Sequence, residues 1–334
     1  MAQVVNIHDP KNEEPQYQSA GNGPQQLELN IPVLRLLHHF QTVTARTLVA
    51  DPGTEDMYQS YLIKLGLDYT FLLHAVLALA ALHLSRLEKQ HRSEYLNRAV
   101  SHHDVALAQF KDQVQDLNED NFQAVLFFAS TMFPYSCAIP LENGDTLTDI
   151  FSGILSNIEL TRRMRAMVTG VYQAMLQSEI ARLVPVDTQG IDWHNSEPPQ
   201  TTELGTLRKF AEATRGIYPP DIVDAYGHAI HVLDIAYSKI SELLHPPSDA
   251  LLKMWIHMIT PRFMELLSER QPGALIIFSH YGVLLGRGKH YWFLDGLAEQ
   301  ILHIADAFVP TEWTKWLEWP REQIFKDRTQ LNTA

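Results

Sequence analysis

The stretch PGALIIFSHYGVLLGRGKHYWFLDGLAEQILHIADAF, Pro272 to Phe308, is almost continuously apolar and yet carries several polar or amphipathic rings. Those rings are His280, Tyr281, His290, Tyr291 and Trp292. The apolar residues recur at helical spacing, which predicts buried helices. The polar rings of this stretch are therefore either core side chains with satisfied polar atoms or the lining of a pocket.

The rest of the chain follows the same helical period. Helices are predicted over about 31–48, 71–84 and 95–110, the second of them apolar nearly all round. Asn118 is expected to cap a further helix that Pro134 ends, and Pro261 to kink or break another. The basic run at 162–165 is expected to be a solvated helix end. No alternating β pattern of useful length is present, so the fold class is predicted to be all-α, a multi-helix bundle.

One large domain is expected between two tails. Residues 1–28 are predicted to be a flexible N-terminal tail, 29–326 a single all-α ligand-binding or catalytic domain, and 327–334 a C-terminal tail. The first residues lack the basic and apolar regions of a signal peptide. No run of about eighteen apolar residues is free of polar interruption, which argues against a membrane span. We expect a soluble, intracellular protein.

Charge and cysteine content exclude several classes of function. The 334 residues include 39 acidic and 26 basic side chains, a formal charge of −13, which repels nucleic acid and anionic lipid. The single cysteine, Cys137, excludes a disulfide framework and a multi-cysteine metal site, and a small buried hydrophobe is its favoured role. Neither nucleic acid nor a membrane is expected as a direct partner.

Signatures of catalysis and metal binding are scarce. No glycine-rich phosphate loop, dinucleotide fingerprint or nucleophile elbow occurs. Asp224, His228 and His231 form the one local trio with metal-ligand spacing on a helix, and an ordinary hydrogen-bonded helix face is the favoured interpretation. His74 and His83 lie on an apolar helix, where bonded core histidines are favoured over catalysts. No metal and no cofactor are expected.

Several segments in their order resemble a known family. LLHHFQTVTARTL, FLLHAVLALAALHLSRL, PGALIIFSHYGVLL and WTKWLEWP resemble the C-terminal regulatory domain of fungal zinc-cluster transcription factors, in particular the sterol-uptake-regulator branch. The resemblance covers about residues 29–326. It implies an all-α bundle that, in the sterol-sensing members, holds a hydrophobic ligand among the C-terminal helices.

The chain departs from that family at its N-terminus. Residues 1–30 hold no cysteine and no basic cluster, so the zinc module that enters DNA in those regulators is not expected here. As a domain without its DNA reader, the chain is also similar to the fungal hetero-Diels-Alderases of tropolonic sesquiterpenoid biosynthesis, of the xenovulene and eupenifeldin type. That resemblance implies dehydration of a hydroxymethyl tropolone to an o-quinone methide, and capture of this diene by a humulene-type alkene.

A cycloaddition needs two apolar partners held in one orientation and a few hydrogen-bond donors, with no cofactor. For it we predict His280 and Tyr281 as catalytic donors and Asp295 as the group that orients a histidine. The predicted substrate-binding residues are Trp255, Phe278, Trp292 and His74.

Two alternatives to the enzyme stay open. One is a sterol- or metabolite-responsive transcriptional regulator that acts through protein contacts, and the other is a lipid-binding or interaction protein without catalysis. A large apolar ligand and a possible homo-oligomer fit each of them. The expected location is cytoplasmic, or nuclear for the regulator.

Overall fold

The computed structural model describes residues 29–49, 51–139, 146–194, 196 and 202–331. Within these ranges the chain forms α-helices joined by short 3-10 and π-helical turns, and no strand, so the predicted all-α class is confirmed. The predicted tail over 1–28 lies outside the described residues. The α-helices are α1 (Ile31–His39), α2 (Leu62–Asp68), α3 (Thr70–Leu87), α4 (Arg92–Gln113), α5 (Phe122–Ala138), α6 (Leu147–Thr169), α7 (Tyr172–Leu176), α8 (Gly205–Thr214), α9 (Pro220–Glu242), α10 (Asp249–Met258), α11 (Pro261–Ser268), α12 (Pro272–Gly286), α13 (Leu297–Phe308) and α14 (Glu318–Leu331).

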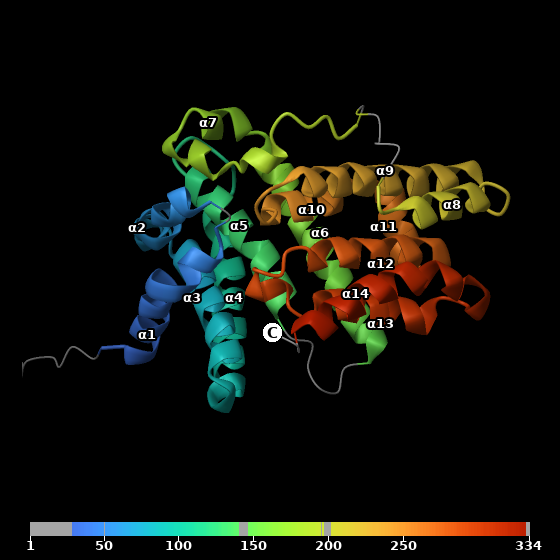
Figure 1. Cartoon of the computed structure of the whole chain (residues 1–334). Helices are drawn as coiled ribbons and strands as arrows, with labels where there is room; N and C mark the ends of the chain where they lie inside the picture. The colour runs from blue at the N-terminus through green and yellow to red at the C-terminus, as the bar shows by residue number, and fades with distance from the viewer. Residues whose placement is uncertain (1–28, 50, 140–145, 195, 197–201, 332–334) are drawn as a thin grey trace, which may run out of the picture.

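The helices gather in two groups (Figure 1), and the buried apolar residues of both belong to one continuous core. In the N-terminal group α3 packs against α1, α2, α4 and α5, and in the C-terminal group α12 packs against α9, α11, α13 and α14. Helix α6 packs on both α5 and α10 and so joins the two groups. The turn Trp292–Leu294, which connects α12 to α13, also packs on α5 and so links the C-terminal group to the N-terminal one.

Helix α3 corrects the expectation that no segment could span a membrane. Among the described residues it is the one helix long and apolar enough by length and composition. Buried residues make up 72% of it in this fold, as in the core helix of a globular domain. An all-round apolar helix needs partners on every side, and α3 finds them in its four neighbours.

Proline and glycine mark most of the boundaries. Pro261 separates α10 from α11, because it takes the first position of α11 and the hydroxyl of Thr260 accepts a hydrogen bond from the Phe263 N–H. Gly296, with φ of +82°, turns the chain into α13 in the left-handed region that favours glycine. Gly273 allows α9 and α12 to approach, since a Cβ there would lie 2.5 Å from a ring carbon of Tyr226.

Pro134 does not end its helix, contrary to the sequence-based expectation. Helix α5 starts at Phe122, after a turn made by Asn118, and continues through Pro134 to Ala138. Proline removes one backbone hydrogen bond there, but residues on both sides of it are buried. The tertiary contacts of this apolar segment therefore hold the helix together across the proline.

Two further boundaries differ from expectation. Arg162 is not part of a solvated helix end, because its guanidinium donates to the carbonyl oxygens of Ile256 and Ile259 at 2.6 and 2.7 Å. These carbonyls lie at the C-terminal end of α10, where backbone acceptors lack helical partners. At the other end of the chain α14 runs to Leu331, into the residues expected to form a tail.

Candidate functional site

Every residue of α12 from Gly273 to Leu285 is buried, so His280 and Tyr281 both lie inside the protein. They point to different neighbours, because adjacent helical residues diverge by about 100°. The Tyr281 ring stacks on Trp255 with centroids 4.3 Å apart, towards α10. The His280 ring stacks on Trp319 of α14, with centroids 5.2 Å apart. The two predicted catalytic donors therefore do not share one site.

One of the two ring nitrogens of His280 bonds within its own helix. Its Nδ1 lies 2.8 Å from the carbonyl oxygen of Ile276, which makes Nδ1 the donor. Burial lowers the pKa of His280 to about 4, so the ring is neutral near pH 7. Among the described residues neither the Nε2 of His280 nor the hydroxyl of Tyr281 has a hydrogen-bond partner. Burial also raises the pKa of Tyr281 well above its usual value.

Asp295 does not orient a histidine in this structure. Its side chain is 87% exposed and pairs with the guanidinium of Arg86, at an N–O distance of 3.6 Å. His280 is buried, and its Nδ1 bonds to the carbonyl oxygen of Ile276 within α12. The predicted triad of His280, Tyr281 and Asp295 is thus divided among three environments.

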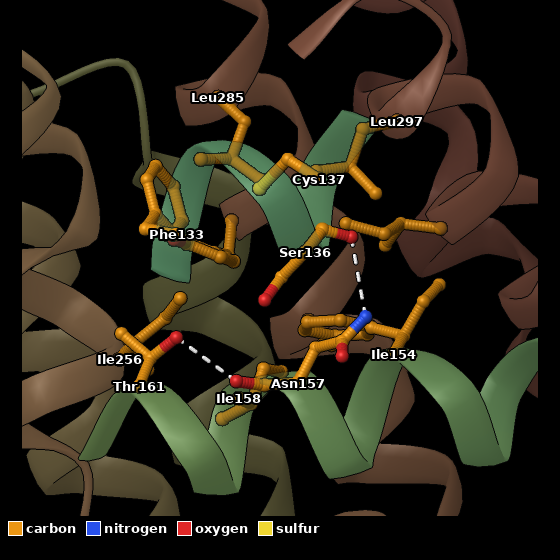
Figure 2. Close-up of a pocket in the computed structure, with 13 residues that line it drawn as sticks. Phe133, Ser136, Cys137, Ile154, Asn157, Ile158, Thr161, Ile256, Leu285 and Leu297 are labelled. Carbon is orange, nitrogen blue, oxygen red and sulfur yellow. Dashed lines mark hydrogen bonds between the residues drawn. The ribbon is translucent and has the colours of Figure 1, made fainter. Parts of the chain in front are cut away.

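Figure 2 shows a small chamber that is lined by residues of α5, α6, α10, α12 and α13. Phe278 and Tyr281 contribute to its wall, together with Cys137, Leu285 and Leu297. Its volume is about 40 Å³, enough for about one water and far below the 300 Å³ or more of a typical ligand pocket.

Two polar side chains of the chamber bond within its wall, whereas the Tyr281 hydroxyl has no partner among the described residues. The Asn157 side-chain nitrogen donates to the carbonyl oxygen of Ser136 at 3.1 Å, and the Thr161 hydroxyl donates to the carbonyl oxygen of Asn157 at 2.9 Å (Figure 2). Cys137 is half-buried, and burial raises the pKa of its thiol, which disfavours the thiolate form.

A larger groove adjoins the chamber. It holds about 380 Å³, lies between the end of α12, the segment 289–299 and α14, and shares Leu285 with the chamber. Apolar atoms of Leu285, Leu294, Ala298 and Ile324 line it. Its volume falls in the range of small-molecule sites. We call this cavity the Trp292 groove, after the aromatic residue in its wall.

Trp292 connects the groove to the N-terminal group of helices. Its indole Nε1 donates to the Thr47 hydroxyl at 2.9 Å, and its ring stacks on His83 with centroids 4.7 Å apart. The Nδ1 of His83 lies 3.0 Å from the Thr44 hydroxyl, and burial lowers the pKa of His83 to about 4. Hence His83 is a neutral, bonded core histidine.

The other two predicted substrate-binding residues, Trp255 and His74, line neither the chamber nor the groove. Trp255 is completely buried and donates from its indole nitrogen to the carbonyl oxygen of Ala229 at 2.9 Å. His74 pairs with His102, their Nδ1 atoms 2.9 Å apart between α3 and α4, and lines neither the chamber nor the groove. Of the predicted set, Phe278 and Tyr281 line the chamber, while Trp292 and Asp295 line the groove.

The sequence-based reasoning missed Arg86, which also lines the groove. Its signal was the basic residue in the last turn of α3, a helix whose other residues are mostly apolar. The helical trio of Asp224, His228 and His231 does not form a metal site. His228 Nε2 bonds to the Met258 carbonyl oxygen at 2.9 Å, and no set of three His, Cys, Asp or Glu side chains among the described residues is arranged to bind a metal ion.

Comparison with known proteins overturns the enzymatic interpretation. Residues 35–137 match the family model of the fungal specific transcription factor domain. A Zn(2)-C6 fungal-type transcription factor of Gibberella zeae is 24% identical over 307 residues, 86% of this chain and 60% of its own length. The prediction of a hetero-Diels-Alderase, with its cycloaddition and dehydration, is wrong, because the matches are to transcription factors.

Two sterol uptake control proteins show how much of the relatives this chain represents. Sterol uptake control protein 2 of Saccharomyces cerevisiae is 25% identical over 292 residues, 84% of this chain and 31% of its own length. The Candida albicans protein of that name is 32% identical over 289 residues, 81% of this chain and 39% of its own length. The chain thus spans about a third to three fifths of these relatives, and over most of its own length it is similar to fungal transcription regulators, with a match to their fungal specific transcription factor domain.

Proposed function

We propose that this chain is a ligand-responsive regulatory domain of a fungal transcription regulator, and that the Trp292 groove is its ligand site. The observation that carries the proposal is the groove itself, a cavity of about 380 Å³ in a chain that resembles sterol uptake control proteins over most of its length. A cavity of this size with an apolar lining suits a large apolar or amphipathic metabolite.

The position of the groove supports a regulatory role. Its wall residue Trp292 contacts Thr47 and His83, which belong to the N-terminal group of helices. A ligand that prefers one orientation of this indole would also change the stability of those contacts. Residues 35–137, the region that matches the transcription factor domain, include both Thr47 and His83.

The remaining assignments follow from this function. The proposed unit is a single ligand-binding domain over about 29–326 that works in the nucleus through protein contacts. The net charge of −13 disfavours direct contact with nucleic acid or with an anionic membrane. Self-association is the proposed mode of assembly, because most soluble oligomers are symmetric homo-oligomers.

The test uses a substitution that fills the groove. Gly286 lines the groove at the end of α12, and a Cβ added there would meet no atom within 4 Å, so Gly286→Leu should block the cavity without straining the fold. Gly227→Leu on the exposed side of α9 is the matched control, because a Cβ there also meets no atom within 4 Å.

The chain should be fused to a heterologous DNA-binding module in yeast, and a reporter measured with and without sterol depletion. We expect the reporter to respond to sterol depletion in the wild type and in Gly227→Leu, and not to respond in Gly286→Leu. Binding of ergosterol and of neutral apolar probes by the purified chain should follow the same order. A wild type that neither responds nor binds, or a Gly286→Leu variant that behaves as the wild type, would refute the proposal.

A further inference from the structure

Arg86 places a positive charge at the wall of the Trp292 groove. It lies in the last turn of α3, its side chain is 29% exposed, and its guanidinium carbon is 5.7 Å from the centre of the Trp292 ring. Burial is the main influence on its pKa, which it lowers, and this indicates a partly desolvated guanidinium. Arginine stays charged under such conditions, so a charge this poorly hydrated favours a nearby anion.

The contacts of Arg86 are long for a charged group. Its distance to the Asp295 carboxylate is 3.6 Å, and that to the carbonyl oxygen of Ala138, the last residue of α5, is 3.3 Å. Charge-assisted N–H to O bonds usually measure about 2.7–2.9 Å. In the same protein Arg287 approaches Glu203 to 2.7 Å. Asp295 is therefore a loose partner, and its 87% exposure keeps it well hydrated without Arg86.

The charge of the groove as a whole differs from that of the protein. Three basic residues line it, Arg86, Arg287 and Lys289, against two acidic ones, Asp295 and Glu299. The complete chain has a formal charge of −13. Arg287 is paired with Glu203 at 2.7 Å, so the other charged residues of the lining, Arg86 and Lys289 against Asp295 and Glu299, are balanced in number. In a protein with an excess of acidic residues, such a place repels an anionic ligand group less than the rest of the surface does.

We propose that the ligand of the Trp292 groove is an amphipathic carboxylic acid. Its carboxylate would bind the Arg86 guanidinium side on and replace Asp295, and its apolar body would lie over Leu285, Leu294 and Ile324. A planar carboxylate matches the fork of donors that a guanidinium offers, and it forms two short bonds where Asp295 forms one long contact. This inference rests on the proposed function of the same groove and narrows its ligand to an acid, so a neutral sterol or alcohol of similar size should bind less tightly.

Calorimetric titration of the full chain with decanoic acid and with decanol at neutral pH tests the head group at constant chain length. We expect the acid to bind at least about tenfold more tightly, the size of effect that a charged hydrogen-bond pair supports. Asp295→Asn removes the competing carboxylate from an exposed position, so it should tighten binding of the acid several-fold and leave the alcohol unchanged. Arg86→Gln should abolish the preference for the acid, and Arg163→Gln, on an exposed part of α6, should not.

Arg86 also bonds to the end of α5, so the melting temperature of Arg86→Gln must be compared with that of the wild type. If this variant does not fold, the Asp295→Asn result decides, because that residue is exposed. Equal affinity for acid and alcohol, with both blocked by Gly286→Leu, would overturn the acid preference and leave the groove as the ligand site. Absence of binding by either compound, together with the refuting reporter result described above, would overturn both proposals.

Discussion

Replacing Tyr281 by phenylalanine removes one oxygen atom from the middle of the C-terminal core. Tyr281 is 1% exposed, and its ring stacks on Trp255 with centroids 4.3 Å apart. The hydroxyl has no hydrogen-bond partner among the described residues. Phenylalanine keeps the ring and its stacking, so the substitution isolates the energetic contribution of the hydroxyl.

The expected effect is a gain in stability. A buried polar group without a partner costs about 1–3 kcal/mol of desolvation free energy. Removing it should raise the free energy of unfolding by about 1 kcal/mol, since a small void replaces the oxygen and offsets part of the gain. For a domain of this size the melting temperature should rise by roughly 2 °C.

Tyr237→Phe is the matched control. Tyr237 is also buried, at 4% exposure, but its hydroxyl donates to the His280 carbonyl oxygen at 2.9 Å. Loss of that bond should lower the free energy of unfolding by about 1 kcal/mol. Urea denaturation followed by tryptophan fluorescence should therefore give shifts of opposite sign for the two substitutions, with similar slopes against urea concentration.

A loss of stability in Tyr281→Phe equal to that in Tyr237→Phe would refute the reasoning. It would mean that the Tyr281 hydroxyl has a partner, and a water in the chamber of about 40 Å³ is the first candidate. Tyr281→Phe should change the affinity for a ligand of the groove only slightly, because Tyr281 lines the chamber and not the groove.

Three further predictions concern single contacts. Gly273→Ala should lower the free energy of unfolding by more than about 2 kcal/mol, because the added Cβ would lie 2.5 Å from the buried ring of Tyr226. Gly227→Ala on α9 should raise the free energy of unfolding by about 0.5–1 kcal/mol, and thermal denaturation of both variants checks this. Arg162→Met should cost about 2 kcal/mol through the loss of two bonds to the end of α10, and Arg163→Met, whose guanidinium is exposed, less than about 0.5 kcal/mol, measured by urea denaturation. Burial lowers the pKa of His280 from 6.5 to about 4, so between these pH values the unfolded state binds more protons and the free energy of unfolding falls as the pH decreases. His280→Gln should reduce this loss of stability at acidic pH by up to about 3 kcal/mol, and an unchanged pH profile of stability would contradict the assignment.

Much of the helical framework could be predicted because its signals are local. The apolar runs that became α3 and α12 show no polar stripe, and such helices must be surrounded by others. Pro261 separated two helices as expected, since proline suits the first turn and its effect is confined to one residue. Pro134 did not end α5, because buried contacts on both sides of it outweigh one lost backbone bond, and such contacts are not visible in the sequence.

The candidate site could be predicted only in part. Four of the residues selected for their chemistry do line cavities: Phe278, Tyr281, Trp292 and Asp295. The selection could not tell that they belong to two cavities, since this depends on which helices cover each face of α12. Arg86 was missed because it lies about 200 residues earlier in the chain and joins the groove only through packing of α3 beside the turn at Trp292.

The sequence by itself determined the all-α class, the two apolar central helices and the acidic character of this protein, because hydrophobic period, helix-breaking residues and charge act locally or as sums over the chain. The tertiary structure alone decided that His280, Tyr281 and Asp295 do not form one site. Adjacent residues on a helix point about 100° apart, and a turn can leave a carboxylate in solvent. Residues that are close in sequence therefore need not have side chains that are close in space. Only the packing of α3 beside the turn Trp292–Leu294 brings a loosely paired arginine and an indole to the same groove.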